Sequence, residues 1–236
     1  MSSQALPLWE SRVQEMAAIA EHVKALDANR ELAILEAGCG RKWPLDLGDT
    51  PYRLTGVDLD ADALAHRRDV VRDLHIAVHG DLSTVHIEPQ SFDVVYSSFV
   101  LEHVRDARPI LENFIRWVRP GGLIVLRIPD RDSAYGLVTR CTPFWVHVAY
   151  LRYARGFRNA GKPGFAPYPT YYDRGMSRNA IHELARSNGF SIVEERGFTG
   201  IPSAFRFVPF LVSLFSRTAW RHDNVTMVLR RSRTAR

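Results

Sequence analysis

The stretch Ala33-Ile34-Leu35-Glu36-Ala37-Gly38-Cys39-Gly40 decides how the rest of the chain is interpreted. Its apolar run is too short for a helix and stops at turn residues, so it predicts a buried strand. Gly38 and Gly40 lack a Cβ and tolerate positive φ, so the backbone there can approach a ligand closely. A loop of this kind, at the carboxyl edge of a parallel sheet, is where an open α/β fold binds a nucleotide-like ligand. Two such glycines are equally typical of an ordinary tight turn, so the prediction depends on the residues beyond Gly40.

Strands alternate with helices over the first half of the chain. Residues 8–30 show apolar positions at helical spacing. The further elements expected up to Pro129 are strands at 53–58, 76–81, 91–99 and 123–128 and helices at about 60–73 and 109–118, the last stopped by Pro120-Gly121-Gly122. This alternation predicts an α/β fold: a Rossmann-like, doubly wound, mostly parallel seven-stranded sheet with helices on both faces.

After Pro129 the alternation stops. Residues 130–176 are rich in aromatic residues, Pro, Gly and Arg, and an insertion of this length is usually functional. A helix at 177–188 and strands at 190–195 and 225–229 then complete the sheet, with an apolar segment at 200–216 between those strands. We expect a single domain whose parts are an N-terminal helical segment (1–30), a cofactor-binding core (31–129), an acceptor or lid insertion (130–176) and the C-terminal part of the sheet (177–236).

Composition argues against several classes of protein, namely disulfide-rich, secreted and membrane-spanning ones. With 236 residues, 46% hydrophobic and 24% charged, the chain is typical of a soluble globular protein. Cys39 and Cys141 make no disulfide framework, and neither a signal peptide nor a membrane-spanning run is found, so a cytoplasmic location is expected. The net charge of +5 favours an anionic partner, but scattered arginines are equally typical of a solubilising surface.

Three acidic residues, Glu36, Asp58 and Asp81, end or follow three successive predicted strands. Because the carboxyl ends of parallel strands lie along one edge, these carboxylates are expected to face a common crevice. Asp58 lies about 20 residues after the glycines, where a carboxylate can accept hydrogen bonds from both hydroxyls of a ribose. The pattern therefore predicts a nucleotide-like ligand.

The segments together resemble the class I S-adenosylmethionine-dependent methyltransferases, of the small-molecule type with a methyltransferase-11-like domain. The resemblance covers about residues 30–130. It rests on Leu35-Glu36-Ala37-Gly38-Cys39-Gly40, Gly56-Val57-Asp58, Gly80-Asp81-Leu82, Phe92-Asp93-Val94-Val95, Leu101-Glu102-His103-Val104 and Arg119-Pro120-Gly121-Gly122. It implies S-adenosyl-L-methionine as the cofactor and direct displacement of its methyl group by a small-molecule acceptor.

The resemblance also implies which residues bind the cofactor. Asp58 would bind the ribose, Leu59 would pack on the adenine, and Asp81 would accept from its exocyclic amine. The full implied set is Glu36, then Gly38, Cys39 and Gly40 lining the methionine part, Asp58 and Leu59, Asp81 and Leu82, and Ser97 and Ser98 beside the sulfonium through backbone atoms.

Two positions depart from the family pattern. Lys42, followed by Trp43, stands where a third glycine is usual, so contacts to the methionine tail differ, and Arg41 or Lys42 is an alternative partner for its carboxylate. Phe99 stands where metal-binding relatives carry a Glu, so no metal is expected, and His103 alone is a poor ligand set.

Three other functions compete with this interpretation. A nicotinamide-dependent oxidoreductase needs the third glycine that Trp43 does not supply. A nucleic-acid methyltransferase is favoured by the positive charge, but Tyr96-Ser97-Ser98-Phe99 is not the Asn/Asp-Pro-Pro-Tyr/Phe run typical of enzymes acting on base amines, so nucleic acid is not the expected partner. A non-catalytic S-adenosylmethionine-binding relative stays open.

The acceptor is expected to be small and aromatic or hydrophobic. The aromatic residues of the insertion either extend the core or form a lid over it: Phe144, Trp145, Tyr150, Phe157, Tyr168, Tyr171 and Tyr172. The stretch Phe205–Phe215, flanked by Arg206 and Arg217, is a candidate for peripheral membrane contact.

His103 and His147 are the candidate catalytic bases. A hydroxyl acceptor profits from a base whereas a neutral amine does not, and histidine titrates near neutral pH. O-methylation is therefore expected ahead of N-methylation. The alternatives are that His103 orients its loop through a backbone carbonyl, that His147 is a surface side chain, and that no side-chain base acts.

Overall fold

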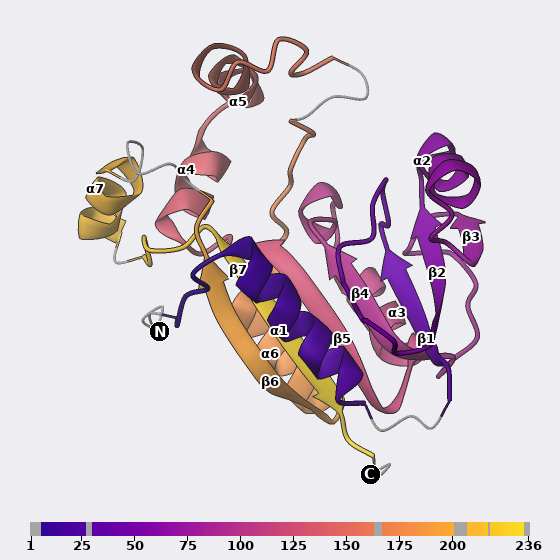
Figure 1. Ribbon diagram of the computed structural model, residues 1–236. Coiled ribbons are helices and arrows are strands. Elements are labelled where there is room, and N and C mark those ends of the chain that lie inside the picture. Colours follow the sequence, from indigo (N-terminus) through magenta and orange to yellow (C-terminus); the bar gives the residue numbers. More distant parts are fainter. Residues whose placement is uncertain (1–5, 27–29, 163–166, 201–206, 217, 234–236) are drawn as a thin grey trace.

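A single seven-stranded sheet carries the core of the molecule, which we describe from a computed structural model over residues 6–26, 30–162, 167–200, 207–216 and 218–233. The strand order is β3-β2-β1-β4-β5-β7-β6, and only β7 runs antiparallel to its neighbours (Figure 1). The strands are β1 (Leu32–Ala37), β2 (Tyr52–Asp58), β3 (Ile76–His79), β4 (Phe92–Ser98), β5 (Val118–Pro129), β6 (Phe190–Phe198) and β7 (Asn224–Arg231). This arrangement confirms the predicted doubly wound α/β class. The strand order reverses between β1 and β4, which is where such folds bind ligands.

Helices cover both faces of the sheet because successive strand residues point to opposite sides. On one face α1 (Arg12–Lys24) packs over Leu32, Ile34 and the equivalent positions of the neighbouring strands. On the other face α3 (Arg108–Trp117) and α6 (Arg178–Ser187) pack over Leu35, Ala37 and their neighbours. Ser177 caps α6, its hydroxyl accepting from the Ala180 amide.

Some predicted boundaries were wrong. β5 begins at Val118 rather than at 123, so Pro120-Gly121-Gly122 lie inside the strand and not between helix and strand. Gly122 packs so closely that a Cβ there would lie 2.6 Å from the Asp93 carbonyl oxygen, which explains the glycine. The helix predicted over 60–73 divides into α2 (Ala61–His66) and the π-helical turn η1 (Arg67–Val71).

The insertion after β5 stands above the carboxyl ends of the strands, on the side of β5, β6 and β7 (Figure 1). It contains α4 (Ala134–Cys141), α5 (Phe144–Ala149), η3 (Tyr150–Ala154) and η4 (Arg174–Met176). A later helix, α7 (Phe207–Ser216), packs beside α4. Of the aromatic residues predicted to extend the core or form a lid, Tyr172 belongs to the core, whereas the exposed ones are Phe144, Trp145, Phe157, Tyr168 and Tyr171. Most of these side chains therefore do not extend the core. Within the described residues, no helix has both the length and the apolar character needed to cross a membrane.

Candidate functional site

The glycine loop after β1 is closed on one side and open on the other. The Gly38 amide donates to the Val57 carbonyl at 2.8 Å, and a Cβ on Gly38 would lie 2.3 Å from Val100 Cγ2. Gly40 also has positive φ, at +50°, but nothing lies within 4 Å of the place of its Cβ. At Gly38 the loop therefore packs against Val57 and Val100, while Gly40 at its tip faces open space, as a ligand-binding loop requires.

Asp58, at the end of β2, is oriented entirely by backbone amides. Its Oδ2 accepts from the Gly40 amide at 2.8 Å and its Oδ1 from the Asp60 amide at 2.9 Å. A carboxylate oxygen has more than one acceptor site, so both oxygens can still accept from a diol. The next residue, Leu59, is 68% exposed and available for packing against a ring.

Asp81 lies in the loop after β3, because that strand ends at His79 instead of reaching Asp81 as predicted. Its Oδ1 accepts from the amide and the hydroxyl of Ser83, both at 2.7 Å, and these bonds hold the pKa of Asp81 below its usual range. The side chain of Leu82 is buried, and its carbonyl accepts from Asn113 at 2.8 Å. The loop that carries both residues is therefore held in place from α3.

Glu36 is buried and paired beneath the glycine loop. Its Oε2 lies 3.0 Å from Arg67, a fully buried guanidinium that also binds Asp73 at 2.6 Å and donates to the Cys39 carbonyl at 2.8 Å. Burial raises the pKa of the Glu36 carboxyl to about 8, against the pull of Arg67, which lowers it. Burial also raises the pKa of the Cys39 thiol to about 12, which suits a turn residue and not a nucleophile.

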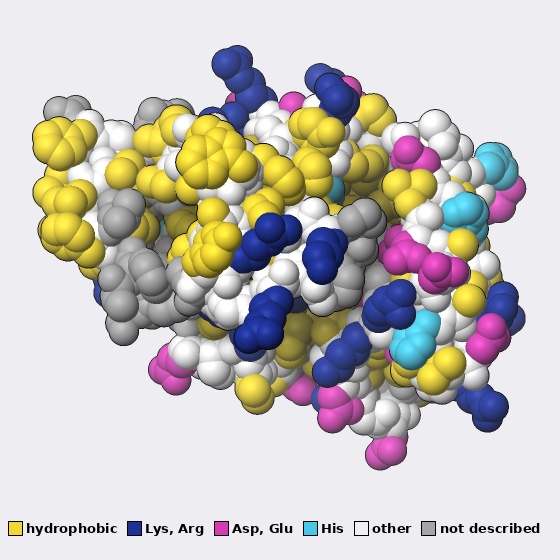
Figure 2. Space-filling model, turned by 90° about the horizontal axis from the view of Figure 1, so that it is seen from above, with side chains coloured by type: hydrophobic (Ala, Val, Ile, Leu, Met, Phe, Trp, Pro, Cys, Tyr) yellow, Lys and Arg dark blue, Asp and Glu magenta, His cyan; other side chains and the backbone are white. Residues whose placement is uncertain are grey.

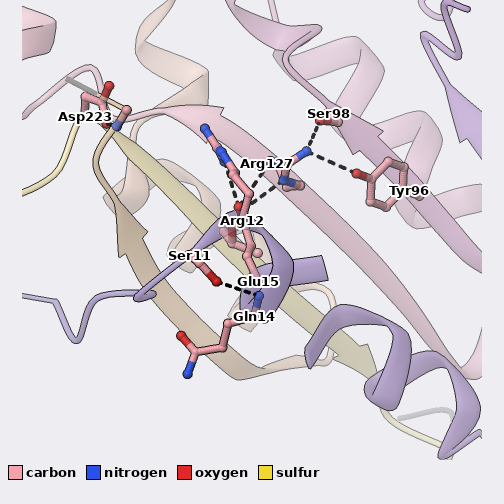
Figure 3. A network of polar contacts seen from close by, with 10 residues as sticks. Ser11, Arg12, Gln14, Glu15, Tyr96, Ser98, Arg127 and Asp223 are labelled. Carbon is pink, nitrogen blue, oxygen red and sulfur yellow. Dashed lines mark hydrogen bonds and ion pairs between the residues drawn. The ribbon is translucent and has the colours of Figure 1, made fainter. Parts of the chain in front are cut away.

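The end of β4 is joined to the N-terminal helix by a buried network (Figure 3). Arg127 of β5 donates to the Ser98 hydroxyl at 2.8 Å and pairs with Glu15 of α1 at 2.9 Å. Thr226 also donates to Glu15. The Ser97 hydroxyl is buried and has no partner in the described part of the chain. The last strand residues are therefore fixed through side chains of α1, β5 and β7.

The two candidate bases lie on different elements. His103 ends η2 (Leu101–His103), just after β4, and its Nδ1 lies 2.9 Å from the Pro169 carbonyl. A carbonyl only accepts, so Nδ1 carries the proton and the neutral ring holds its lone pair on Nε2. His147 lies in α5, and its Nε2 is 2.6 Å from the Thr142 hydroxyl.

A cavity of about 290 Å³ lies within the insertion, beside η2. Its lining combines cationic, hydroxyl and aromatic side chains: Arg131, Thr139, Arg140, Thr142, Phe144, His147, Pro169, Thr170, Tyr171 and Tyr172. The Tyr171 amide donates to the Glu102 carbonyl at 2.8 Å, and His103 bonds to Pro169. The cavity wall is thus attached to the residues that follow β4, and His147 but not His103 lines it.

Comparisons with known proteins agree with this geometry. The family described as "Methyltransferase domain" matches residues 35–126. A "Probable S-adenosylmethionine-dependent methyltransferase" of Mycolicibacterium smegmatis is 32% identical over 164 residues, covering 68% of this chain and 62% of that protein. The matched part of the chain is a class I S-adenosylmethionine-dependent methyltransferase domain.

Other relatives match smaller parts. The "Malonyl-[acyl-carrier protein] O-methyltransferase" of Enterobacter lignolyticus is 29% identical, over 46% of this chain and 43% of its own. The "Phosphoethanolamine N-methyltransferase 1" of Arabidopsis thaliana is 26% identical, over 48% of this chain and 25% of its own. The matches thus span less than two thirds of each of these relatives. A solved methyltransferase from Methanosarcina mazei has the same fold, with a TM-score of 0.57 at 15% identity, over 87% of this chain and 94% of its own.

The geometry fits S-adenosylmethionine, the cofactor named for these relatives. Gly40 leaves open space, Asp58 and Asp81 present pre-oriented carboxylates, and Ser97 holds an unpartnered hydroxyl beside the strand end. These are positions that the sequence predicted. Among the described residues, no three His, Cys, Asp or Glu side chains gather in a way that could hold a metal ion, and the absence of a metal requirement stays a prediction.

Four further residues near the site were not predicted. Arg67 and Arg127 supply the buried charges that hold the glycine loop and Ser98, and Glu15 balances Arg127. Glu102, beside His103, is 4% exposed, and its Oε2 has no partner among the described residues. Burial raises the pKa of Glu102 to about 8. Glu102 does lie in a family motif, Leu101–Val104. In contrast, Glu36 lies 31 residues from Arg67 and Glu15 lies 112 residues from Arg127, so no sequence pattern joins these pairs.

Proposed function

We propose that this chain transfers the methyl group of S-adenosylmethionine to a hydroxyl, or alternatively an amine, of a small acceptor bound in the insertion cavity. The observation that carries the proposal is the direct attachment of the cavity wall to η2, through Tyr171 to Glu102 and through Pro169 to His103. The aromatic part of the lining, Phe144 among it, suits an acceptor with a ring or an apolar portion.

The residues of the chain mainly bind and align the reactants. The cofactor, when bound, supplies an electrophilic methyl group on a sulfonium, open to direct displacement. Asp58 and Asp81 fix the nucleoside end, and the buried Arg127 network holds the end of β4, so that the reacting groups keep one geometry. Phe99, at φ +57°, has the Arg12 and Arg127 guanidinium groups within 5.5 Å of its ring centre, which fixes its position next to Ser98.

His103 is the favoured base for a hydroxyl acceptor. Its Nδ1–H bond to Pro169 leaves the Nε2 lone pair available, and His103 follows the strand that borders the cofactor site. His147 is the alternative, because it lines the cavity itself. Transfer to a neutral amine would need neither.

We also propose that the outer surface of this region contacts an anionic membrane surface. Residues 130–176 and 199–221, here called the acceptor half, contain ten of the chain's 31 Lys and Arg but three of its 26 Asp and Glu, so acidic residues outnumber basic ones elsewhere. Figure 2 shows hydrophobic side chains over the end of the molecule where α7 lies, with Lys and Arg side chains next to them. On α7, Phe207 is 64% exposed and Phe215 is 90% exposed. Phe205, Arg206 and Arg217 of the predicted membrane stretch lie outside the described residues.

Calorimetry and a methyl-transfer assay test the central proposal. We expect S-adenosylmethionine to bind and raise the melting temperature, and label from its methyl group to appear in a small acceptor and not in RNA. Label transferred only to RNA would favour a nucleic-acid methyltransferase. Cofactor binding without turnover on any acceptor class would favour a non-catalytic relative.

Asp58→Ala is the matching variant. Loss of the bonds from the ribose hydroxyls to a charged acceptor is expected to cost about 1.5–3 kcal/mol, or roughly 10- to 150-fold in cofactor affinity. Asp62→Asn, four residues further along at an exposed position, is the control and should bind normally. Equal affinity of Asp58→Ala and Asp62→Asn would place the ribose elsewhere.

A further inference from the structure

The insertion cavity is lined by cations and by no carboxylate among the described residues that form it. Arg131 is the second residue after β5, and Arg140 lies in the last turn of α4. Thr139 and Thr142 add hydroxyl groups, and Phe144 adds an aromatic ring. The lining therefore combines positive charge and hydrogen-bond donors with one apolar side.

Arg131 is held in a defined orientation at the cavity. Its Nε donates to the Tyr172 carbonyl at 3.0 Å and its Nη1 to Asp132 at 3.2 Å, and its side chain is 14% exposed. Its Nη2 has no hydrogen bond within the described chain. Burial, together with the nearby Arg140 and Arg174, lowers the pKa of Arg131. Asp132 and Asp173 oppose this shift, and because arginine stays charged in proteins, Arg131 presents a cation to the cavity.

Arg140 has even fewer partners. Its Nε bonds to the Gly136 carbonyl of its own helix at 3.3 Å, and in the described residues neither terminal nitrogen is engaged. A guanidinium with free terminal nitrogens binds carboxylate and phosphate through two parallel hydrogen bonds. The volume of about 290 Å³ is at the lower end of small-molecule sites, which are typically about 300–1,000 Å³.

We propose that Arg131 and Arg140 bind an anionic group of the methyl acceptor, a phosphate or a carboxylate. This rests on the proposed function, since it assigns the cavity to the acceptor. The acceptor class is then a small anion with a ring or apolar portion packed near Phe144 and with a nucleophilic hydroxyl or amine. Such an anion can be a soluble metabolite or the head group of a lipid, and the chemistry recognised is the same in both.

Calorimetry with the full chain and simple probes tests the assignment. The probes are inorganic phosphate, phenyl phosphate and benzyl alcohol, which keeps the ring but has no charge. We expect phenyl phosphate to bind at least tenfold more tightly than benzyl alcohol, and Arg140→Gln to weaken phenyl phosphate binding at least tenfold. Arg68→Gln is the control, because Arg68 is 60% exposed on η1 and pairs only with Asp69. Arg131→Gln is a second variant, used once its melting curve matches that of the wild type.

The outcomes separate this assignment from the proposed function. Binding of S-adenosylmethionine with no preference for phenyl phosphate over benzyl alcohol overturns the anionic site alone. Failure of S-adenosylmethionine to bind overturns the proposed function. Equal affinities in Arg140→Gln and Arg68→Gln also overturn the site. If vesicles containing phosphatidic acid compete with phenyl phosphate and neutral phosphatidylcholine vesicles do not, the site is supported and a lipid is its source; lack of competition assigns a soluble acceptor.

Discussion

The two halves of the carboxyl edge of the sheet differ in how far their arginines are paired within the protein. In the cofactor half, around β1, β2 and β3, the buried arginine is matched within the protein: Arg67 lies between Glu36 and Asp73. In the acceptor half, Arg131 and Arg140 have nitrogens without partners in the described chain. Seen from above in Figure 2, acidic and histidine side chains lie mainly at one end and hydrophobic ones at the other.

The difference indicates what each half is built to bind. A cofactor shared by a whole family favours loops held by internal ion pairs, with backbone amides that orient Asp58 before the ligand arrives. The proposed acceptor would be recognised by guanidinium nitrogens that have no partner in the described chain and by the apolar surface beside them. Variants in each half test whether the two halves contribute independently to unfolding free energy, turnover, the pH dependence of stability and membrane binding.

Arg67→Met is expected to have the largest effect. It removes the cation that lies between Glu36 and Asp73, and breaking a buried pair from one side typically costs about 3–5 kcal/mol. Urea unfolding would measure the loss in unfolding free energy. Arg68→Gln, one residue along, pairs with Asp69 on the surface and should stay within about 0.5 kcal/mol of wild type. Similar stability in both variants would show that the glycine loop does not depend on its buried charges.

The histidine variants test which half supplies the base. His103→Ala or His147→Ala should lower kcat at least about 100-fold, or about 2.7 kcal/mol, if that ring is the base, with cofactor affinity unchanged. His86→Ala is the control, because its side chain is 89% exposed. The measurement is turnover on the acceptor found by methyl transfer, from pH 6 to 9. Activity within a few fold of wild type in both variants would leave alignment without a base and weaken the case for a hydroxyl acceptor.

The sheet could be predicted from sequence because its determinants are local, and the candidate cofactor residues rest on equally local signals. Apolar runs, the glycines at 38 and 40, and acids at strand ends lie within a few residues of one another. The partners of Arg127 could not be predicted: Glu15 lies 112 residues away, and the pairing exists only once α1 crosses the sheet. The cavity lining likewise comes from a turn, two short helices and an irregular segment. No hydrophobic periodicity in the sequence marks these residues as neighbours.

A further local signal was misleading. Pro120-Gly121-Gly122 is typical of a turn, yet these residues lie in β5, because the close approach of Asp93 requires a glycine there. The aromatic residues of the insertion predict an aromatic or hydrophobic acceptor. Of these residues Phe144, Tyr171 and Tyr172 line the cavity, beside two arginines that the sequence did not single out. Composition reports which residues a segment has, not which of them face inward.

Glu102 is expected to make stability depend on pH. Its pKa is about 8 in the folded protein, whereas a free glutamate lies near 4.5, so between these values the folded state holds a proton that the unfolded state has lost. Its contribution therefore falls as pH rises through this window, by up to about 1.4 kcal/mol per pH unit. Glu102→Gln should reduce the slope by this amount in urea unfolding at pH 5.5, 6.5 and 7.5, leaving the part due to Glu36, whose pKa is also about 8. Glu112→Gln, at a half-exposed position on α3, should keep it. An unchanged slope in Glu102→Gln would mean that the carboxyl is ionised when buried.

Membrane contact is expected to give the smallest effect, and it concerns the acceptor half alone. Phe215 on α7 is 90% exposed, so Phe215→Ser removes apolar surface without disturbing packing. We expect co-sedimentation with vesicles rich in phosphatidylglycerol, little with pure phosphatidylcholine, and roughly fivefold weaker binding in Phe215→Ser, equivalent to about 1 kcal/mol. Raising the salt concentration should weaken binding in both proteins, because screening reduces the attraction of arginines to anionic lipid. Val70→Ser is the matched control, since Val70 is 68% exposed but lies on η1 in the cofactor half. If Val70→Ser loses as much binding as Phe215→Ser, or if neutral vesicles bind equally well, the contact does not belong to α7 and the surface charge of the acceptor half serves the soluble acceptor alone.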